Sequence, residues 1–401
     1  MNFIDLDFFI KGHITERKES LFQQDIDDNF NSLNDKIFGK SVLVIGGAGT
    51  IGSSFIKSIL NYKPSKLVVV DTNENGLTEL TRLLRSTNNQ YVPDEYFTYP
   101  MSFSDSAFEK MFMHHKPFNI VANFAAHKHV RSEKDIFSIQ SMIENNLLKA
   151  KKLMDILVEN KPKHFFCVST DKAANPVNIM GASKKLMENM IMNYSDKLNI
   201  TTARFANVAF SNGSLLEGHL KRILNKQPIS CPSDVKRYFV SPEESGQICM
   251  IACLLGKSGD IFFPKLPQTS MKNFSDITLK LFKYLNKEII ICNSDEEARN
   301  KIINLDDNSP YPVYFFKTDT SGEKLFEEFY EESDKINNDS FNSLGIIHGN
   351  KSKDNIFLFL EQLNNLFKQK NYNKNDIVNL LSKYIKTFNH THTGKNLDQK
   401  M

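Results

Sequence analysis

The segment Ser41-Val-Leu-Val-Ile45-Gly46-Gly47-Ala48-Gly49-Thr50-Ile51-Gly52 points to the architecture of this chain. A short apolar strand runs straight into a glycine-rich turn, and a helix is expected from about Ser53 to Leu60. The glycines fit two spacings, GxGxxG from Gly47 and GxxGxxG from Gly46. Glycine permits the tight turn and lets the backbone approach a pyrophosphate, while the helix start offers free N–H groups and a positive dipole end. We therefore predict dinucleotide contacts at Gly46, Gly49, Thr50, Ile51 and Gly52.

An acidic residue ends the second predicted strand, Lys66 to Val70. Asp71 lies 19 residues after Gly52, close to the ~20 at which an acid holds the adenosine ribose in dinucleotide-binding folds. Its charge would repel a 2′-phosphate, so the cofactor is predicted to be NAD rather than NADP, with Asn73 beside it. The alternative is that Asp71 is an ordinary residue of the turn that follows the strand.

Strands and helices continue to alternate after this point. The alternation predicts a doubly wound parallel sheet of the Rossmann type with right-handed crossovers. Further strands are expected near 96–99, 118–124, 164–168 and 201–207, with a long helix over 131–159 that is broken near Ser138. The predicted division is a helical N-terminal extension (1–37), an NAD-binding domain (38–210), a smaller α+β substrate lobe with segments that return to the first domain (211–345), and C-terminal helices with a tail (346–401).

The segment Ser169 to Lys184 follows the apolar run His164 to Val168 and precedes a helical pattern from Ala182 to Tyr194. Asp171 and Lys172 should therefore lie just beyond the carboxyl end of a strand. Ligands bind at that edge in open α/β sheets. The alternative is a polar turn with an Asp-Lys pair in solvent.

Composition excludes several classes of function. Fifty basic and 47 acidic residues leave a net charge of only +3, which argues against the clustered basic face of a nucleic-acid-binding protein. No apolar run approaches the ~20 residues of a membrane helix. Five cysteines without a CxxC pair predict neither a zinc site nor a disulfide framework, and indicate a reducing, cytoplasmic location. His127 and His129 have no carboxylate or cysteine at ligand spacing, so no metal is expected.

Five segments together carry a family resemblance: 46–52, 169–184, 204–214, 237–239 and 322–328. The strongest is Thr170-Asp-Lys followed by Asn175-Pro and Met180-Gly-Ala-Ser-Lys184. On these motifs, residues 39–330 resemble extended short-chain dehydrogenase/reductase enzymes of the CapD-like polysaccharide-biosynthesis type. The most similar group is that of the UDP-N-acetylglucosamine 4,6-dehydratases of the legionaminic-acid pathway, which make precursors of bacterial surface glycans and nonulosonic acids.

The resemblance implies an NAD-dependent dehydration of UDP-N-acetylglucosamine to a UDP-4-keto-6-deoxy sugar. Asp171 would be the acid toward the 6-hydroxyl and Lys172 the base at C5, while Thr170 would bind the 4-oxygen. Lys184 would bind the nicotinamide ribose. Both catalytic groups need unusual protonation, which burial favours and their mutual attraction opposes.

The resemblance also implies binding roles elsewhere in the chain. Ala125 and Asn146 would line the cofactor site. Residues facing the UDP-sugar would be Lys128, Asn207, Ser214, Arg237 and Glu323. Arg237 is the natural partner of the diphosphate, since a guanidinium pairs bidentately with phosphate oxygens.

The chain also departs from the family pattern. Met180 stands where the wider superfamily has a tyrosine, as it does in one subgroup of the dehydratases, whose products usually keep the C5 configuration. Retention at C5 is therefore expected. Ala206 replaces a usual glycine, and Thr320-Ser321 replaces an Arg-Pro pair. The alternatives are a sugar-nucleotide 4-epimerase or ketoreductase, and a catalytically idle NAD-binding assembly protein. A homo-oligomer, dimer or hexamer, is expected.

Three further expectations concern the second half of the chain and its histidines. Residues 319–330 are predicted to be a loop that enters a helix. Two amphipathic helices are expected within 354–388. His114, His115 and His390 are predicted to lie at the surface.

Overall fold

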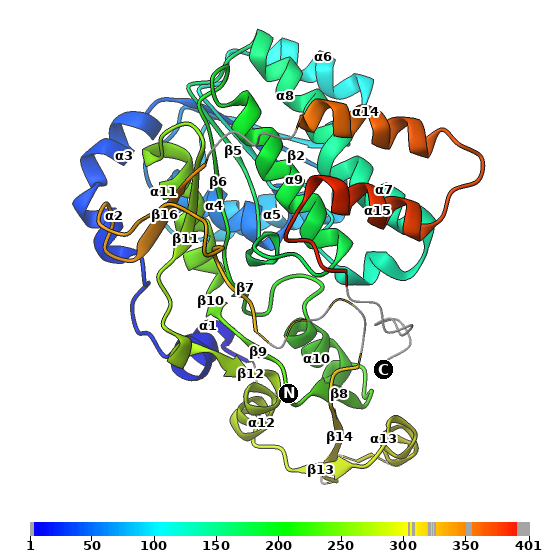
Figure 1. The fold of residues 1–401 in the computed structure, drawn as a ribbon. Helices are drawn as coiled ribbons and strands as arrows, with labels where there is room; N and C mark the ends of the chain where they lie inside the picture. Colours follow the sequence, from blue (N-terminus) through cyan, green and yellow to red (C-terminus); the bar gives the residue numbers. More distant parts are fainter. Residues whose placement is uncertain are drawn as a thin grey trace.

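The computed structural model describes residues 4–303, 305–306, 309–319, 322, 324, 326–349 and 355–390. Within these residues a nine-stranded sheet has the order β15-β16-β11-β6-β5-β4-β1-β2-β3 (Figure 1). Strands β1 to β6 and β11 are parallel, while β16 and β15 are antiparallel additions at one edge. The strand bounds are Ser41–Ile45 (β1), Lys66–Asp71 (β2), Glu95–Pro100 (β3), Ile120–Asn123 (β4), His164–Cys167 (β5), Ile200–Ala203 (β6), Asp260–Pro264 (β11), Ile336–Asn337 (β15) and Leu344–His348 (β16).

This order confirms the predicted doubly wound α/β fold. From β1 the chain moves outward through β2 to β3 and then returns to the other side of β1 as β4. The order therefore reverses between β1 and β4, which is where such sheets form a crevice at the carboxyl ends of their strands. Strands β1, β2 and β4 are buried along most of their length, because helices cover both faces of a parallel sheet.

Helices lie on the two faces of the sheet (Figure 1). On one face, α4 (Thr50–Leu60) packs closely on α11 (Pro242–Leu255). A Cβ atom on Gly246 would lie 2.3 Å from the backbone of Ser54, so only glycine lets these helices approach so closely. The other face carries α7 (Ile136–Ile143), α8 (Ala150–Glu159) and α9 (Ile179–Tyr194). Other helices are α3 (Phe30–Ile37), α5 (Glu74–Ser86) and α6 (Ser106–His115).

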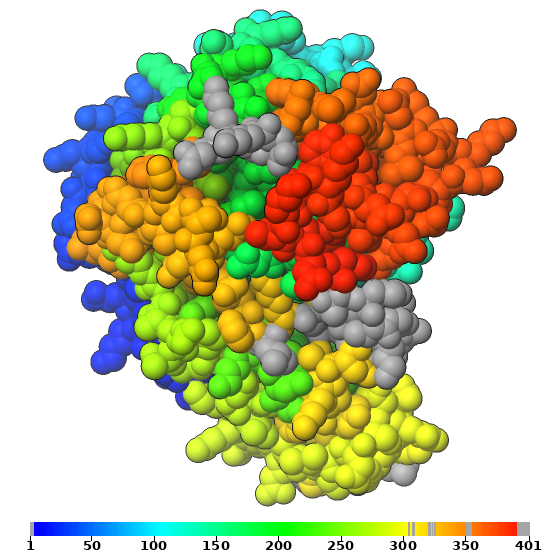
Figure 2. Space-filling view, in the orientation of Figure 1, coloured from blue at the N-terminus to red at the C-terminus, as the bar shows by residue number. Residues whose placement is uncertain are grey.

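A smaller lobe projects from the main body and is coloured from green to yellow in Figure 2. Its parallel sheet has the order β13-β14-β8. The bounds are Ile289–Cys292 (β13), Tyr311–Phe316 (β14), Ile229–Pro232 (β8), Leu215–Leu224 (α10), Phe274–Tyr284 (α12) and Asp295–Ile302 (α13). Two short strand pairs connect the lobe to the body: Asn207–Val208 (β7) with Phe239–Val240 (β10), and Lys236–Arg237 (β9) with Lys272–Asn273 (β12). The predicted boundaries of the substrate lobe stay a prediction.

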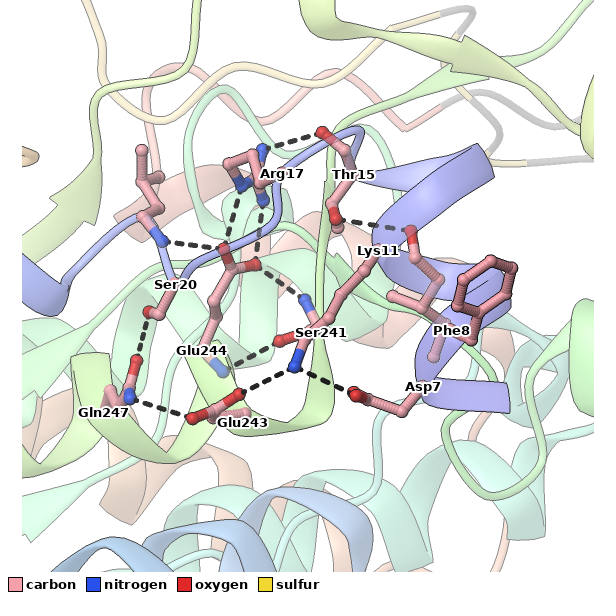
Figure 3. A network of polar contacts seen from close by, with 12 residues as sticks. Asp7, Phe8, Lys11, Thr15, Arg17, Ser20, Ser241, Glu243, Glu244 and Gln247 are labelled. Atoms are coloured by element: carbon pink, nitrogen blue, oxygen red, sulfur yellow. Dashed lines mark hydrogen bonds and ion pairs between the residues drawn. The ribbon is translucent and has the colours of Figure 1, made fainter. Parts of the chain in front are cut away.

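The N-terminal extension packs on the body and on the smaller lobe. It contains α1 (Leu6–Phe9), a π-helical turn (Ile10–Ile14), α2 (Gln23–Asp28) and α3. Phe9, Ile10 and Ile14 are buried in one apolar cluster with Ala209 and Phe210, which follow β7, and with residues of β10, α10 and α12. Beside them, Arg17 makes a bidentate ion pair with the buried carboxylate of Glu244, at 2.8 Å for each bond (Figure 3).

Two C-terminal helices, α14 (Ile356–Phe367) and α15 (Lys374–Tyr384), confirm the two amphipathic helices expected there. Both pack on α9, and they lie side by side in orange and red (Figure 1). In the parts of the chain that the structure describes, no helix combines the length and the apolar character needed to cross a membrane.

The region predicted as one long helix over 131–159 is more broken than expected. A 3-10 turn (Val130–Lys134) precedes α7, and a π-helical segment (Glu144–Lys149) separates α7 from α8. The break expected near Ser138 lies at Asp135, because the Asp135 carboxylate accepts the backbone N–H bonds of Phe137 and Ser138 and so starts a new helix.

Three other expectations were wrong. The strand expected over 201–207 is split, because the chain turns at the buried Arg204 between β6 and β7. The described residues of 319–330 are not helical, since the Phe329 carbonyl accepts a bond from Arg204 instead of a helical N–H. His115 is buried against Tyr99, and His390 is half-buried beside Glu133.

Candidate active site

The glycine-rich turn joins β1 to α4 at the point where the strand order reverses. Gly46 has a φ of +76°, a value that favours glycine, and its N–H donates to the Val70 carbonyl at 2.7 Å. A Cβ atom on Gly46 would lie 2.6 Å from the Ala125 nitrogen, and one on Gly52 would lie 2.3 Å from the Gly46 carbonyl oxygen. These two glycines are therefore required by the packing of the protein itself.

Gly49 differs from these glycines. Its φ of −73° is open to any residue, and the nearest atom to an added Cβ would be the Gly46 oxygen at an ordinary 3.5 Å. Gly49 occupies the N-cap of α4 without a capping side chain. The fold therefore does not explain a glycine here, whereas a ligand close to the start of the helix would. The turn therefore has the geometry that suits a dinucleotide pyrophosphate. Thr50 and Ile51, which were predicted to contact the dinucleotide, lie in the first turn of α4.

Asp71 lies at the end of β2 beside this turn. Its Oδ2 accepts the Ala48 N–H at 3.0 Å and its Oδ1 accepts the Asn73 N–H at 2.9 Å. The carboxylate is thereby fixed next to the glycine-rich turn, with lone pairs left for a ribose hydroxyl. The Asn73 side chain caps α5 by accepting a hydrogen bond from the Gly76 N–H, so this residue has a structural role.

Asn146 lies in the π-helical segment Glu144–Lys149 and contacts the loop that follows β4. This buried amide accepts the His127 N–H at 2.9 Å and donates to the His127 carbonyl at 3.0 Å. It also donates to Ser183 on α9 at 3.1 Å. Asn146 therefore holds the loop that begins at Ala125, beside the glycine-rich turn.

The predicted catalytic residues follow β5, on the far side of β4. Thr170 donates from Oγ1 to Asp171 Oδ1 at 2.9 Å, and Lys172 Nζ donates to the same oxygen at 3.1 Å. Asp171 is buried and Lys172 is mostly buried, with 19% of its side chain exposed. The Asp-Lys pair therefore does not lie in open solvent, which was the alternative reading of this turn.

A third acid joins the pair. Glu327 Oε1 lies 3.4 Å from Lys172 Nζ and 3.8 Å from Arg237 Nη2. Both Glu327 and Arg237 are buried. Glu327 Oε2 is also buried, and it has no hydrogen-bond partner among the described residues. Four charged groups, Asp171, Lys172, Glu327 and Arg237, thus form one chain at the carboxyl edge of the sheet.

The two buried lysines of the site have opposite pKa shifts. Burial lowers the pKa of Lys172, but Asp171 and Glu327 outweigh burial and raise it above its ordinary value. For Lys184, burial lowers the pKa, and the nearby Cys167 and Glu188 offset this only in part. Lys184 Nζ donates to the Val168 carbonyl at 3.0 Å, so it lies beneath the β5 turn.

Met180 lies in the first turn of α9 and is almost fully buried. The start of this helix is held by Asn178, whose Oδ1 accepts the Gly181 N–H at 2.7 Å. Glu133 Oε1 accepts the N–H groups of Ile179 at 2.5 Å and Met180 at 3.3 Å. The side chain of Met180 is therefore fixed in the core beside the site.

The residues predicted to bind the UDP-sugar lie on several different elements. Lys128 donates to the Asn212 carbonyl at 3.0 Å, and Ser214 caps α10 through the Glu217 N–H. Asn207 lies in β7, whose partner strand β10 follows Arg237 closely along the chain. Glu323 lies outside the described residues.

Sequence reasoning missed Glu327, and it did not assign a role to Glu188. Glu188 pairs bidentately with the buried Arg204 and accepts a bond from Ser169 at 2.7 Å. The only signal for Glu327 was its place in the motif 322–328, where the preceding Glu323 was selected instead. Sequence spacing could not reveal that Glu327 reaches Lys172, because 155 positions separate them in the chain.

A family model described as "Polysaccharide biosynthesis protein" matches residues 42–348. The chain belongs to this family. The match covers both the large sheet and the smaller lobe, and it confirms the resemblance found from the motifs.

Two relatives have sequences similar to this chain. A Methanocaldococcus jannaschii protein, described as an uncharacterized membrane protein, is 28% identical over 86% of this chain and 99% of the relative. A Campylobacter jejuni protein named UDP-N-acetylglucosamine 4,6-dehydratase (inverting) is 27% identical over 79% of this chain and 91% of the relative.

Solved structures share the fold of this family member. One is a double mutant of a Streptomyces venezuelae dTDP-glucose 4,6-dehydratase, solved with NAD bound. It has a TM-score of 0.52 and 17% identity, over 72% of this chain and 87% of that chain. At this identity the likeness establishes the fold alone.

Proposed function

We propose that the protein is an NAD-dependent 4,6-dehydratase of UDP-N-acetylglucosamine, producing a UDP-4-keto-6-deoxy-N-acetylhexosamine for surface-glycan synthesis. The observation that carries the proposal is the buried Asp171–Lys172 pair at the carboxyl end of β5, beside the reversal of strand order. The name of the Campylobacter jejuni relative supports the same reaction.

The cofactor would occupy the crevice between the glycine-rich turn and the β4 loop. Gly49 leaves room for the pyrophosphate, and Asp71 would hold the adenosine ribose and disfavour a 2′-phosphate. When bound, NAD supplies the hydride chemistry by accepting a hydride from C4 of the sugar and returning it to C6. It is regenerated in each turnover.

The chain's own residues would move the protons. Asp171 would protonate the departing O6, and Thr170 would bind O4. Lys172, whose pKa is raised by Asp171 and Glu327, would have to lose its proton before it removes the C5 proton that the 4-ketone makes acidic. Each acid or base step is typically worth about 10²–10⁴-fold in rate. Lys184 positions the nicotinamide ribose, and Arg237 faces the diphosphate.

The direct test is incubation of the purified protein with UDP-N-acetylglucosamine in deuterated water. We expect a product lighter by one water in mass spectrometry, with deuterium at C5 in the NMR spectrum. If no UDP-hexosamine loses water, the proposal is wrong. Bound NAD without any turnover would favour an idle assembly protein instead.

Replacement of Asp171 separates a dehydratase from a 4-epimerase. Asp171→Asn keeps the shape of the side chain but cannot protonate O6. We therefore expect dehydration to fall by about 100-fold or more, measured as water loss. An epimerase needs no acid at O6, so a variant that still epimerises at near the wild-type rate would identify the alternative reaction.

We also propose retention at C5. Lys172 is held between Asp171 and Glu327, so the amine that removes the C5 proton would also deliver its replacement, a deuteron in deuterated water, to the same face. The Campylobacter jejuni relative is named as an inverting enzyme. The ring coupling constants of the product distinguish the two outcomes. The homo-oligomer and the cytoplasmic location stay predictions.

A further inference from the structure

The smaller lobe has a strand edge that no other described strand covers. Its parallel sheet has the order β13-β14-β8, so β13 and β8 lie at the two edges. Strand β8 is buried along its whole length, whereas β13 is buried only at Cys292. Strand β13 lies at the tip of the lobe, away from the main body (Figure 1). Of the two edges, that of β13 is therefore open to another strand.

The backbone of β13 presents hydrogen-bonding groups along this edge. Tyr311 of β14 donates its N–H to the Glu288 carbonyl at 2.8 Å. Successive residues of a strand turn their N–H and C=O groups to opposite sides. Ile290 therefore faces β14 as Glu288 does, while Ile289 and Ile291 direct both groups outward. An edge with such groups is a template for pairing with another chain.

The side chains of β13 also favour a partner. The strand reads Ile289-Ile-Ile-Cys292 and contains no charge, whereas edge strands that stay unpaired usually carry a charged residue, a proline or a bulge. Ile291 is 62% exposed. On α12, the exposed Leu279 lines a shallow groove together with Phe282 and Ile289. Pairing at this edge would remove apolar surface from water as well as satisfy the backbone.

The two ends of β13 carry opposite charges, and these charges identify the partner. Lys283 and Lys287 precede the strand and are exposed, while Asp295 and Glu296 open α13 just after it. In the part of the chain that the structure describes, none of these four side chains belongs to an ion pair. An antiparallel copy of the same segment would bring its acidic end to the basic end of the first. The charges therefore fit a second copy of this chain.

We propose that two copies of the chain associate by antiparallel pairing of their β13 edges. The two-fold axis passes beside Ile291, whose outward N–H and C=O groups bond to those of Ile291 in the second copy. This register sets Lys287 opposite Asp295 and Glu288 opposite Ser294. The sheet then continues from one lobe into the other.

A register centred on Ile289 is less favourable. It would set the charged Lys287 opposite the apolar Ile291, and Glu288 opposite Ile290. The association should be weak in either case, because a strand of four residues and its groove bury less than the ~1,200 Å² of a standard interface. We therefore expect a dissociation constant in the micromolar range.

A cysteine at the two-fold axis tests the register. The Cα atoms of a hydrogen-bonded antiparallel pair are about 5.5 Å apart, within the ~4.4–6.8 Å that a disulfide spans. Ile291→Cys should therefore form a disulfide-linked dimer under mild oxidation. Leu224→Cys is the matched control, because Leu224 on α10 is 59% exposed, and it should not become linked. The five native cysteines are buried and should not react.

Sedimentation at increasing protein concentration tests the association itself. Ile291→Lys sets two like charges side by side at the axis and should raise the dissociation constant by about 30-fold or more. Leu224→Lys should leave it unchanged. Both positions are exposed, so both variants should fold as wild type does.

Three results would overturn the proposal. One is a wild-type protein that stays monomeric at about 100 µM, where a micromolar dimer would be populated. Another is an Ile291→Cys variant that becomes linked no faster than Leu224→Cys. The third is an Ile291→Lys variant that associates as strongly as wild type, since the contact would then lie elsewhere on the molecule.

Discussion

At the scale of single residues, the glycine-rich turn contains glycines that serve two different purposes. Gly52 is required by the fold, since a Cβ atom would lie 2.3 Å from the Gly46 carbonyl oxygen. Gly49 meets no such restriction and has an ordinary φ. Residue identity alone therefore does not distinguish a packing glycine from one that makes room for a ligand, whereas the atoms around each position do.

This difference predicts opposite outcomes for two alanine substitutions. Gly49→Ala should cost only about 0.5–1 kcal/mol of unfolding free energy, because alanine is a poorer N-cap than glycine but its methyl group meets no close atom. It should weaken NAD binding by about tenfold or more, because the methyl group would crowd the pyrophosphate. Calorimetric titration with NAD measures the affinity.

Gly52→Ala is the companion variant. It should lose about 2 kcal/mol of unfolding free energy, because the backbone must shift to admit the methyl group. Denaturant unfolding of both variants provides the comparison. If Gly49→Ala binds NAD as well as wild type, the turn does not hold the pyrophosphate.

At the scale of secondary structure elements, ion pairs join segments that are far apart in the chain. Arg17 of the N-terminal extension pairs with Glu244, which also caps α11 through the Ser241 N–H (Figure 3). Helix α11 packs on α4, whose start forms the glycine-rich turn. The extension therefore supports the element that carries the candidate cofactor site.

Breaking this pair should destabilise the protein measurably. Arg17→Met leaves the buried Glu244 carboxylate without its cation, and we expect a loss of about 2–3 kcal/mol in unfolding free energy. Lys11→Met is the control, since Lys11 pairs with the more exposed Asp7 and Glu243 and should cost below about 1 kcal/mol. Equal losses in urea unfolding would contradict the role of the Arg17 pair.

At the scale of the whole molecule, the smaller lobe has its own buried core. His219 on α10 is fully buried and lies 3.3 Å from the Thr278 hydroxyl on α12. Burial lowers the pKa of His219 to about 3, and that of His164 in β5 to about 4. Both histidines are neutral in the folded protein at neutral pH. Acidic pH should therefore destabilise both the smaller lobe and the main sheet.

Stability should therefore fall as the pH drops below the unfolded histidine pKa of about 6.5. The unfolded chain binds a proton at His219 between that value and about 3, whereas the folded chain does not, so folding is favoured less at each lower pH. From pH 7 to pH 5 this one group should cost about 2 kcal/mol.

Replacement of the histidine tests this pH dependence. His219→Asn should remove about 2 kcal/mol from the stability change between pH 7 and pH 5, as measured by urea unfolding at both values. The absolute stability of the variant does not enter this comparison. A variant with the same pH dependence as wild type would contradict the expected protonation of His219.

Local sequence determined the parallel part of the large sheet, the glycine-rich turn and the Asp171–Lys172 turn, because strand periodicity, glycine spacing and adjacent residues all lie within short segments. Tertiary structure alone decided that Glu327 reaches Lys172 and Arg237, that Arg204 ends β6, and that the N-terminal extension supports α11. Each of these contacts brings together charged groups from distant parts of the chain. A buried charge needs an oppositely charged partner close in space, and distance along the sequence does not reveal which residue that is.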